Sequence, residues 1–199
     1  MAGSSGSDNS SNQDREKEVE MTGKDSERTS RARKLHGARL AAGLVAMVAR
    51  SSGDSWRDAA GVGAQATALL ERITPLVRAD AEAWEDALAE LHATTGGDLE
   101  QRNDTLERKL DDAAAVPILI ADTGADAASL AELAADRGEG AYRADAAVAA
   151  VLAAAGARAA SHLVRVNLGV REGDARLARA RRSADAAADA AARALDAAG

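Results

Sequence analysis

Residues 69–91, LLERITPLVRADAEAWEDALAEL, constrain the fold more than any other stretch of the chain. Their large apolar side chains recur every three or four residues, which places them on one face of an α-helix. That face consists of Leu69, Ile73, Val77, Trp84, Leu88 and Leu91. Asp80 falls on the same face. Because burial of an unpartnered carboxylate is costly, either a partner or ligand contacts Asp80, or this part of the face meets water.

The rest of the composition favours the same kind of structure. Hydrophobic residues make up 46% of the 199 residues, most of them alanine, and the chain has no phenylalanine and one tyrosine, Tyr142. Strands favour β-branched and aromatic residues, whereas alanine is the strongest helix former. The only two prolines are Pro75 and Pro117. We therefore predict an all-α protein, an antiparallel bundle of long helices.

Charge and residue types argue against several classes of function. The net charge of −7 gives no general attraction to nucleic acids or anionic membranes, and the absence of cysteine excludes disulfides and thiolate metal sites. The three histidines, His36, His92 and His162, lack the spacing of a metal site. No signal peptide is visible, and we expect no segment long and apolar enough to span a membrane. These features lead us to expect a cytoplasmic protein without a metal.

The chain divides into a polar tail and one helical domain. Residues 1–30 are Ser, Gly, Asn and charged residues, which bury too little apolar surface to fold, so we predict a disordered tail before a single domain at 31–199. The predicted helices span about 30–51, 54–94, 98–135 with a break or bend at Pro117, 142–168 and 174–198. Leu40, Leu44, Met47 and Val48 should face inward from the first helix. We expect the last helix to be peripheral or to pack on a second subunit.

A second acidic residue also lies in line with an apolar face. In the helix at 142–168 the predicted inward stripe is Asp145, Val148, Leu152, Ala155, Ala159, Leu163 and Val166. Asp145 is close to the helix start, so it can equally be an N-cap or a first-turn charge that the helix dipole favours. Two carboxylates facing one cleft could act as general acid and general base for a cationic substrate.

Several segments, taken in order, resemble the cyclodeaminase/cyclohydrolase family. VRADAEAWEDAL is similar to the signature helix of that family, and LAAGLVAMVAR is similar to its first helix. The runs RNDTLERKLDDAAAVPILIA, YRADAAVAAVLAAAGARAA and VRVNL resemble its Arg-containing helix ending in Val-Pro, its Ser-Asp helix and its Asn-Leu ending. The resemblance covers about residues 30–190.

The resemblance implies an all-α homodimer acting on one-carbon units carried by tetrahydrofolate. Such enzymes close 5-formimino-tetrahydrofolate to 5,10-methenyl-tetrahydrofolate with release of ammonia, or hydrolyse the methenyl form. No covalently bound cofactor is implied, and a tetrahydrofolate derivative is the substrate. By resemblance Asp80 would be the catalytic acid/base and Asp145 the second acidic group. The implied substrate-binding residues are Arg102, Arg143 and Asn167.

The chain also departs from the family pattern. Residues 26–32 hold no glycine where the family has a Gly-rich loop, Leu91-His92-Ala93 stands in place of Leu-Pro-Lys, and Arg78 replaces an aspartate. Three functions therefore stay open. The chain can be a folate cyclohydrolase or cyclodeaminase, a diverged member that acts on another amidine-like substrate or only binds folate, or a helical scaffold with structural acids.

Overall fold

The structure, a computed structural model, describes residues 36–92, 99–169 and 173–199. Within these ranges the chain is helical apart from short turns and contains no strand, which confirms the all-α class. The helices are the N-terminal helix (residues 36–51), α2 (Ala59–His92), α3 (Leu99–Arg137), α4 (Arg143–Leu168) and α5 (Ala175–Ala198), with a 3-10 turn at Gly140–Tyr142. The predicted disordered tail, residues 1–30, lies outside the described ranges.

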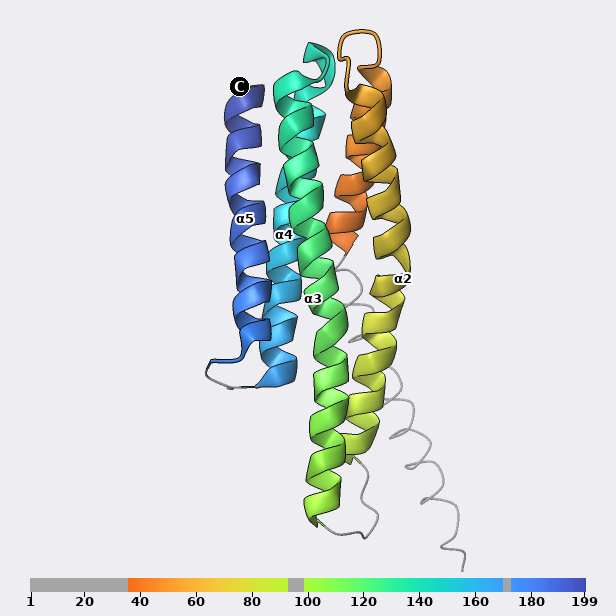
Figure 1. Ribbon diagram of the computed structural model, residues 1–199, viewed down its shortest axis with the longest axis vertical. Coiled ribbons are helices and arrows are strands. Elements are labelled where there is room, and N and C mark those ends of the chain that lie inside the picture. The colour runs from red at the N-terminus through yellow and green to blue at the C-terminus, as the bar shows by residue number, and fades with distance from the viewer. Residues whose placement is uncertain (1–35, 93–98, 170–172) are drawn as a thin grey trace, which may run out of the picture.

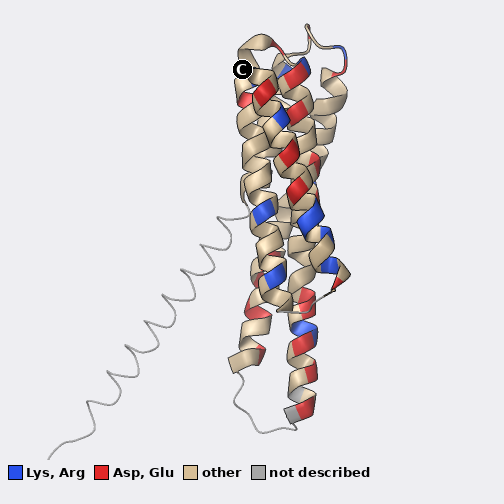
Figure 2. Ribbon diagram, turned by 90° about the vertical axis from the view of Figure 1, so that its left-hand side faces the viewer, with Lys and Arg blue, Asp and Glu red and all other residues tan. Residues whose placement is uncertain are grey.

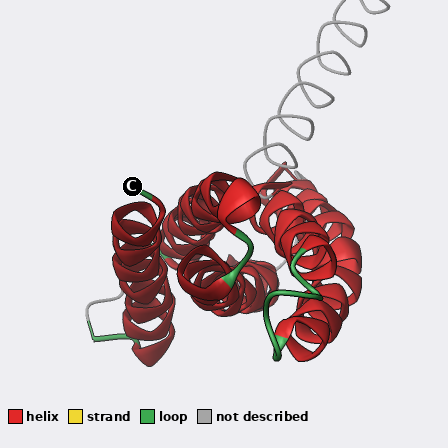
Figure 3. Ribbon diagram, turned by 90° about the horizontal axis from the view of Figure 1, so that it is seen from above, coloured by secondary structure: helices red, strands yellow, loops and turns green. Residues whose placement is uncertain are grey.

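The long helices lie side by side, and consecutive ones run in opposite directions along the long axis (Figure 1). Seen from above, α5 forms one edge of the molecule, and α3 and α4 lie between it and α2 (Figure 3). The far ends of α2 and α3 project beyond the ends of α4 and α5 (Figure 1). The central helices α3 and α4 are therefore covered on more than one side.

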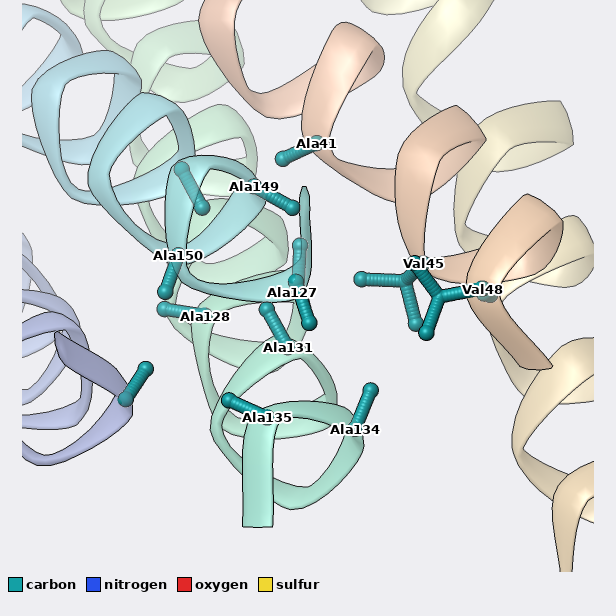
Figure 4. Close-up of a cluster of buried hydrophobic side chains, with 14 of the residues drawn as sticks. Ala41, Val45, Val48, Ala127, Ala128, Ala131, Ala134, Ala135, Ala149 and Ala150 are labelled. Atoms are coloured by element: carbon teal, nitrogen blue, oxygen red, sulfur yellow. The ribbon is translucent and has the colours of Figure 1, made fainter. Parts of the chain in front are cut away.

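The core is built mainly from alanine. Its largest cluster joins the N-terminal helix to α3 and α4, with Ala127, Ala131 and Ala149 close to Val45 and Val48 (Figure 4). Small side chains let helix backbones approach closely. Gly37 and Gly156 mark the closest approach, because a Cβ on Gly37 would lie 2.5 Å from the carbonyl oxygen of Leu152. The tight packing of these helices thus depends on residues with small side chains, alanine and glycine.

Alanine also explains why some predicted inward faces are wrong. Leu40 and Leu91 are 53% and 55% exposed, although both were expected on buried faces. The predicted stripe of α4 is wrong for Val148 and Val166, which are 52% and 49% exposed, whereas Leu163 of that stripe is buried. The buried side of α4 consists instead of Ala146, Ala149, Ala150, Ala153, Gly156, Ala157, Ala160, Leu163, Val164, Asn167 and Leu168. Close packing favours the face with the smallest side chains, so the spacing of the large ones misleads.

Helix α3 runs without interruption through Pro117, where the sequence permitted a break or bend. Proline has no N–H, so the carbonyl oxygen of Ala113, four residues earlier, loses its helical donor. The side-chain amide Nδ2 of Asn167 in α4 donates a hydrogen bond to this oxygen at 2.5 Å. Both Pro117 and Asn167 are fully buried, so this side-chain donor replaces the missing backbone donor where no water reaches.

Helix α5 packs on α3 and α4 of its own chain, at the edge of the molecule (Figure 3). It starts after a turn in which Gly169 and Gly173 have φ of 63° and 82°, and the Asp174 side chain accepts a hydrogen bond from the backbone N–H of Arg176. Its buried face is entirely alanine: Ala180, Ala184, Ala187, Ala190, Ala191 and Ala194. The turn and the helix agree with the sequence prediction to within one residue.

Two helical segments, Asn103–Arg137 and Gly140–Leu168, are long and apolar enough to cross a membrane by length and composition. The sequence-based expectation that no segment meets this criterion is therefore wrong. In both segments about half of the apolar window, 56% and 50%, is buried inside the protein. These segments belong to the two central helices, α3 and α4. Core helices that do not cross a membrane meet the same criterion, because they carry few charged residues.

Candidate functional site

Asp80 is completely buried in α2, with 0% of its surface exposed. It follows Ile73 and Val77, which pack with Ile120 of α3 and Leu163 of α4 in an apolar cluster. Arg78 does not pair with Asp80, because its Nε donates to Glu82 Oε1 at 2.6 Å and its side chain is 82% exposed. A carboxylate therefore lies inside the molecule beside an apolar cluster, and the alternative that this part of the face meets water is wrong.

Ion pairs between α2 and α3 show which residues lie level with Asp80. Lys109 Nζ is 3.3 Å from Asp86 Oδ2, and Arg72 Nη2 is 2.8 Å from Asp126 Oδ2. Because the two helices run in opposite directions, this register places Asp80 level with Val116 and Pro117. Asn167 is held to α3 only a turn away from Pro117. Asp80 of α2, Pro117 of α3 and Asn167 of α4 thus occupy the same level of the molecule.

Asp145 lies at a different level. It is exposed in the first turn of α4, where an acidic side chain meets the positive end of the helix dipole. At 1.5 Å per residue, it is about 30 Å along the axis from the part of α4 that is level with Asp80. Within one chain the two acids therefore do not face a common cleft.

Comparison with known proteins identifies the family of this chain. A family profile described as Formiminotransferase-cyclodeaminase matches residues 35–188. The chain belongs to this family. A solved structure, formiminotetrahydrofolate cyclodeaminase from Thermotoga maritima, superposes with a TM-score of 0.71 at 19% identity, covering 83% of this chain and 85% of that one. No curated protein matches the sequence.

The predicted substrate-binding residues of this formiminotransferase-cyclodeaminase family member differ in burial and in hydrogen-bond partners. Asn167 is 1% exposed and supports α3 at Pro117. Arg143 Nε donates to the carbonyl oxygen of Gly138 at 3.2 Å, which ties the start of α4 to the turn after α3. Arg102 lies in α3, with its side chain outside the described part of the structure. The structure gives Asn167 and Arg143 positions that support the backbone, and their roles toward a substrate stay predictions.

A basic groove between α4 and α5 was not anticipated from the sequence of this family member. It has a volume of about 820 Å³ and is lined by residues from the last part of α4 and from the start of α5. Its charged and hydroxyl lining comprises Arg158, Ser161, His162, Arg165, Asp174, Arg181 and Asp185. The spacing of Arg158, His162 and Arg165, four and three residues apart, was the available signal. Among the described residues no group of three or more His, Asp and Glu could hold a metal ion.

Proposed function

We propose that this protein acts on a one-carbon unit bridging N5 and N10 of tetrahydrofolate, with Asp80 as the acid/base. The observation that carries the proposal is the 0% exposed carboxylate of Asp80, which lies beside an apolar cluster and level with Pro117 and Asn167. Family membership and the fold shared with formiminotetrahydrofolate cyclodeaminase support this substrate class.

In the ring-closing direction, N10 attacks the carbon of the protonated 5-formimino group, an amidinium-like cation, and forms a tetrahedral centre. Asp80 accepts the proton that N10 loses, and delivers a proton to the former imino nitrogen, so that the C–N bond breaks and ammonia leaves. The product is the 5,10-methenyl cation. In the hydrolytic direction, water adds to the methenyl carbon and Asp80 accepts one of its protons. Asp80 then gives this proton to N5 as the C–N5 bond breaks, and the remaining hydroxyl proton is released to solvent. A formyl group then remains on N10.

A buried carboxylate suits this chemistry because the methenyl bridge is an amidinium-like cation. Attraction between opposite charges is stronger in a low-dielectric interior than in water. A fixed negative charge placed where positive charge develops lowers the energy of the transition state without reorganising solvent. The burial of Asp80 therefore suits it both to stabilise positive charge and to move a proton.

The test follows the near-ultraviolet absorbance of the methenyl form in two assays. Loss of absorbance from 5,10-methenyl-tetrahydrofolate reports hydrolysis, and gain of absorbance from 5-formimino-tetrahydrofolate reports ring closure with deamination. We expect turnover in at least one assay, and Asp80→Asn should reduce it at least about tenfold, within the range of general acid–base catalysis. Asp196→Asn, an exposed residue of α5, is the control and should keep the wild-type rate. Wild-type rates equal to buffer in both assays would eliminate the proposal.

A second candidate, folate binding without turnover, is favoured by the absence of glycine from residues 26–32. Trp84 can separate binding from a purely structural role, because it is partly buried one helical turn after Asp80. Bound folate should quench the fluorescence of Trp84. Trp56, 7% exposed and just before the start of α2, should be unaffected, so Trp84→Phe should remove the response. A protein that shows neither turnover nor quenching would be a helical scaffold.

We also propose that the protein is a homodimer, as the family resemblance implies. Val148 and Val151 of α4 are 52% and 42% exposed, and Leu195 of α5 is 53% exposed. Val148 and Leu195 are equally far in sequence from the α4–α5 turn, so they lie level on neighbouring helices. A second copy would cover these side chains. Sedimentation should give twice the chain mass, and Val151→Lys should give the monomer; a monomeric wild type would contradict the proposal.

A further inference from the structure

The groove between α4 and α5 has a charge opposite to that of the protein as a whole. The chain carries a net charge of −7, yet three arginines, Arg158, Arg165 and Arg181, line this one groove. Figure 2 views this side of the molecule and shows basic segments gathered at mid-height, with acidic segments predominating above and below them. Basic residues are therefore concentrated where α5 begins and α4 ends.

The acids nearest to the groove do not neutralise the arginines of α4. Asp174 accepts from the backbone N–H and the guanidinium of Arg176, and the hydrogen bond from the guanidinium holds the pKa of Arg176 above its ordinary value. Asp185 is 3.9 Å from Arg181 within α5. In the described part of the chain, neither Arg158 nor Arg165 pairs with a carboxylate, and the contact of Arg165 Nη2 is with His162 Nδ1 at 3.0 Å.

Several arginines in the described part of the chain pair with an acid of another helix. Arg72 pairs with Asp126, Arg179 pairs with Asp122 at 2.7 Å, and Arg193 donates to both carboxylate oxygens of Glu132 at 2.6 and 2.9 Å. Each of these three arginines therefore has a structural role, because its ion pair joins two helices. Arg158 and Arg165 hold no helix in place, although they project into a groove of about 820 Å³ that could contain a small molecule.

We propose that this groove binds a small anion with two phosphate groups. Arg158 and Arg165 are two turns apart on α4, about 10 Å along the axis, so two guanidiniums can each contact one phosphate of a diphosphate. The Ser161 hydroxyl lies between them as a further donor, and Arg181 faces them from α5.

This site is separate from the site around Asp80. Asp80 is buried in α2, whereas the groove is lined by exposed residues of α4 and α5. Helix α5 lies at the edge of the molecule away from α2 (Figure 3). The proposal therefore does not depend on folate chemistry. Phosphate binding can be present when turnover is absent, and turnover can be present when phosphate binding is absent.

The probe is inorganic pyrophosphate, titrated calorimetrically into the full chain at low and at physiological salt. We expect saturable one-to-one binding that weakens with salt, because the charges are exposed. The double variant Arg158→Gln/Arg165→Gln should weaken binding at least about tenfold, as expected when two charge-assisted contacts are lost. The control Arg50→Gln/Arg57→Gln removes the same charge from exposed residues near the start of α2, away from the groove, and should keep the wild-type affinity within about twofold.

A second variant keeps the test independent of how the arginine variants fold. Ser161→Asp places a carboxylate in the groove and should abolish binding while all three arginines remain. Binding that both double variants weaken equally, or that Ser161→Asp leaves unchanged, would overturn the proposal. So would the absence of binding to wild type. Citrate should bind more weakly than pyrophosphate, and equal or tighter binding of citrate would overturn the assignment to phosphate.

Discussion

At the scale of single residues, Gly37 and Gly156 decide how closely the N-terminal helix approaches α4. A Cβ on Gly156 would lie 2.8 Å from the backbone nitrogen of Ala38, just as one on Gly37 would meet the backbone oxygen of Leu152. Neither neighbour is the flexible end of a side chain, so the helices themselves would have to separate. Glycine is suited to these two positions because it has no side chain, although glycine inside a helix lowers the stability of that helix.

Gly37→Ala should therefore destabilise the protein. Overpacking a close contact costs about 1–3 kcal/mol, which outweighs the higher helix propensity of alanine. Gly43→Ala is the matched control in the same helix, since nothing lies within 4 Å of its added Cβ. That variant should gain up to about 1 kcal/mol. Urea unfolding of both variants provides the measurement, and equal or greater stability of Gly37→Ala would show that the helices do not meet as described.

At the scale of the helices, Pro117 and Asn167 form a unit that lets α3 remain continuous. A buried carbonyl oxygen without a donor costs about 1–3 kcal/mol, and Asn167 prevents this cost at Ala113. The sequence indicated helices on both sides of Pro117 but not the continuity between them. The donor that permits the continuity comes from a residue fifty positions away, which local patterns do not reveal.

This unit can be tested by a double-mutant cycle. Asn167→Ala should lower the free energy of unfolding by about 1–3 kcal/mol, because the Ala113 oxygen loses its donor. In a Pro117→Ala background the restored N–H supplies a donor within α3. The same Asn167→Ala change should then cost at least about 1 kcal/mol less. Denaturant unfolding of the four proteins gives the coupling, and additive effects would mean that Asn167 does not serve Pro117.

The helices themselves were largely predictable, whereas their buried faces and the site were predictable only in part. Gly169, Gly173 and Asp174 are residues with strong preferences at helix ends, so the start of α5 was predicted to within one residue. Asp80 was recognisable because large apolar residues flank it on one face. Asp145 has mostly alanine around it, and alanine occurs on both faces of α4, so its side of the helix was not evident.

At the scale of the whole molecule, α5 is attached by two kinds of contact. Its alanine face packs against α3 and α4, and Arg176, Arg179 and Arg193 reach acids of α3. The side chains of these arginines are 36%, 59% and 58% exposed. Ion pairs that are open to solvent contribute little to stability. The alanine contacts should therefore provide most of the attachment.

Two substitutions in α5 can compare these contacts. Arg193→Met removes the pair with Glu132 and should change the free energy of unfolding by less than about 1 kcal/mol. Ala187→Leu adds bulk at a residue with 0% exposure and should cost about 1–3 kcal/mol. Guanidinium unfolding measures both variants. A larger loss for Arg193→Met than for Ala187→Leu would mean that the ion pairs dominate.

The alanine core has a thermal consequence. The heat capacity of a protein rises on unfolding mainly because apolar surface becomes hydrated, by about 12–15 cal/mol/K per residue in ordinary domains. Each alanine exposes little such surface, and the largest buried cluster here consists chiefly of alanine. Calorimetry should therefore give a heat-capacity change of unfolding per residue that is below that range. The stability of this protein would then change slowly with temperature, and resist cooling as well as warming.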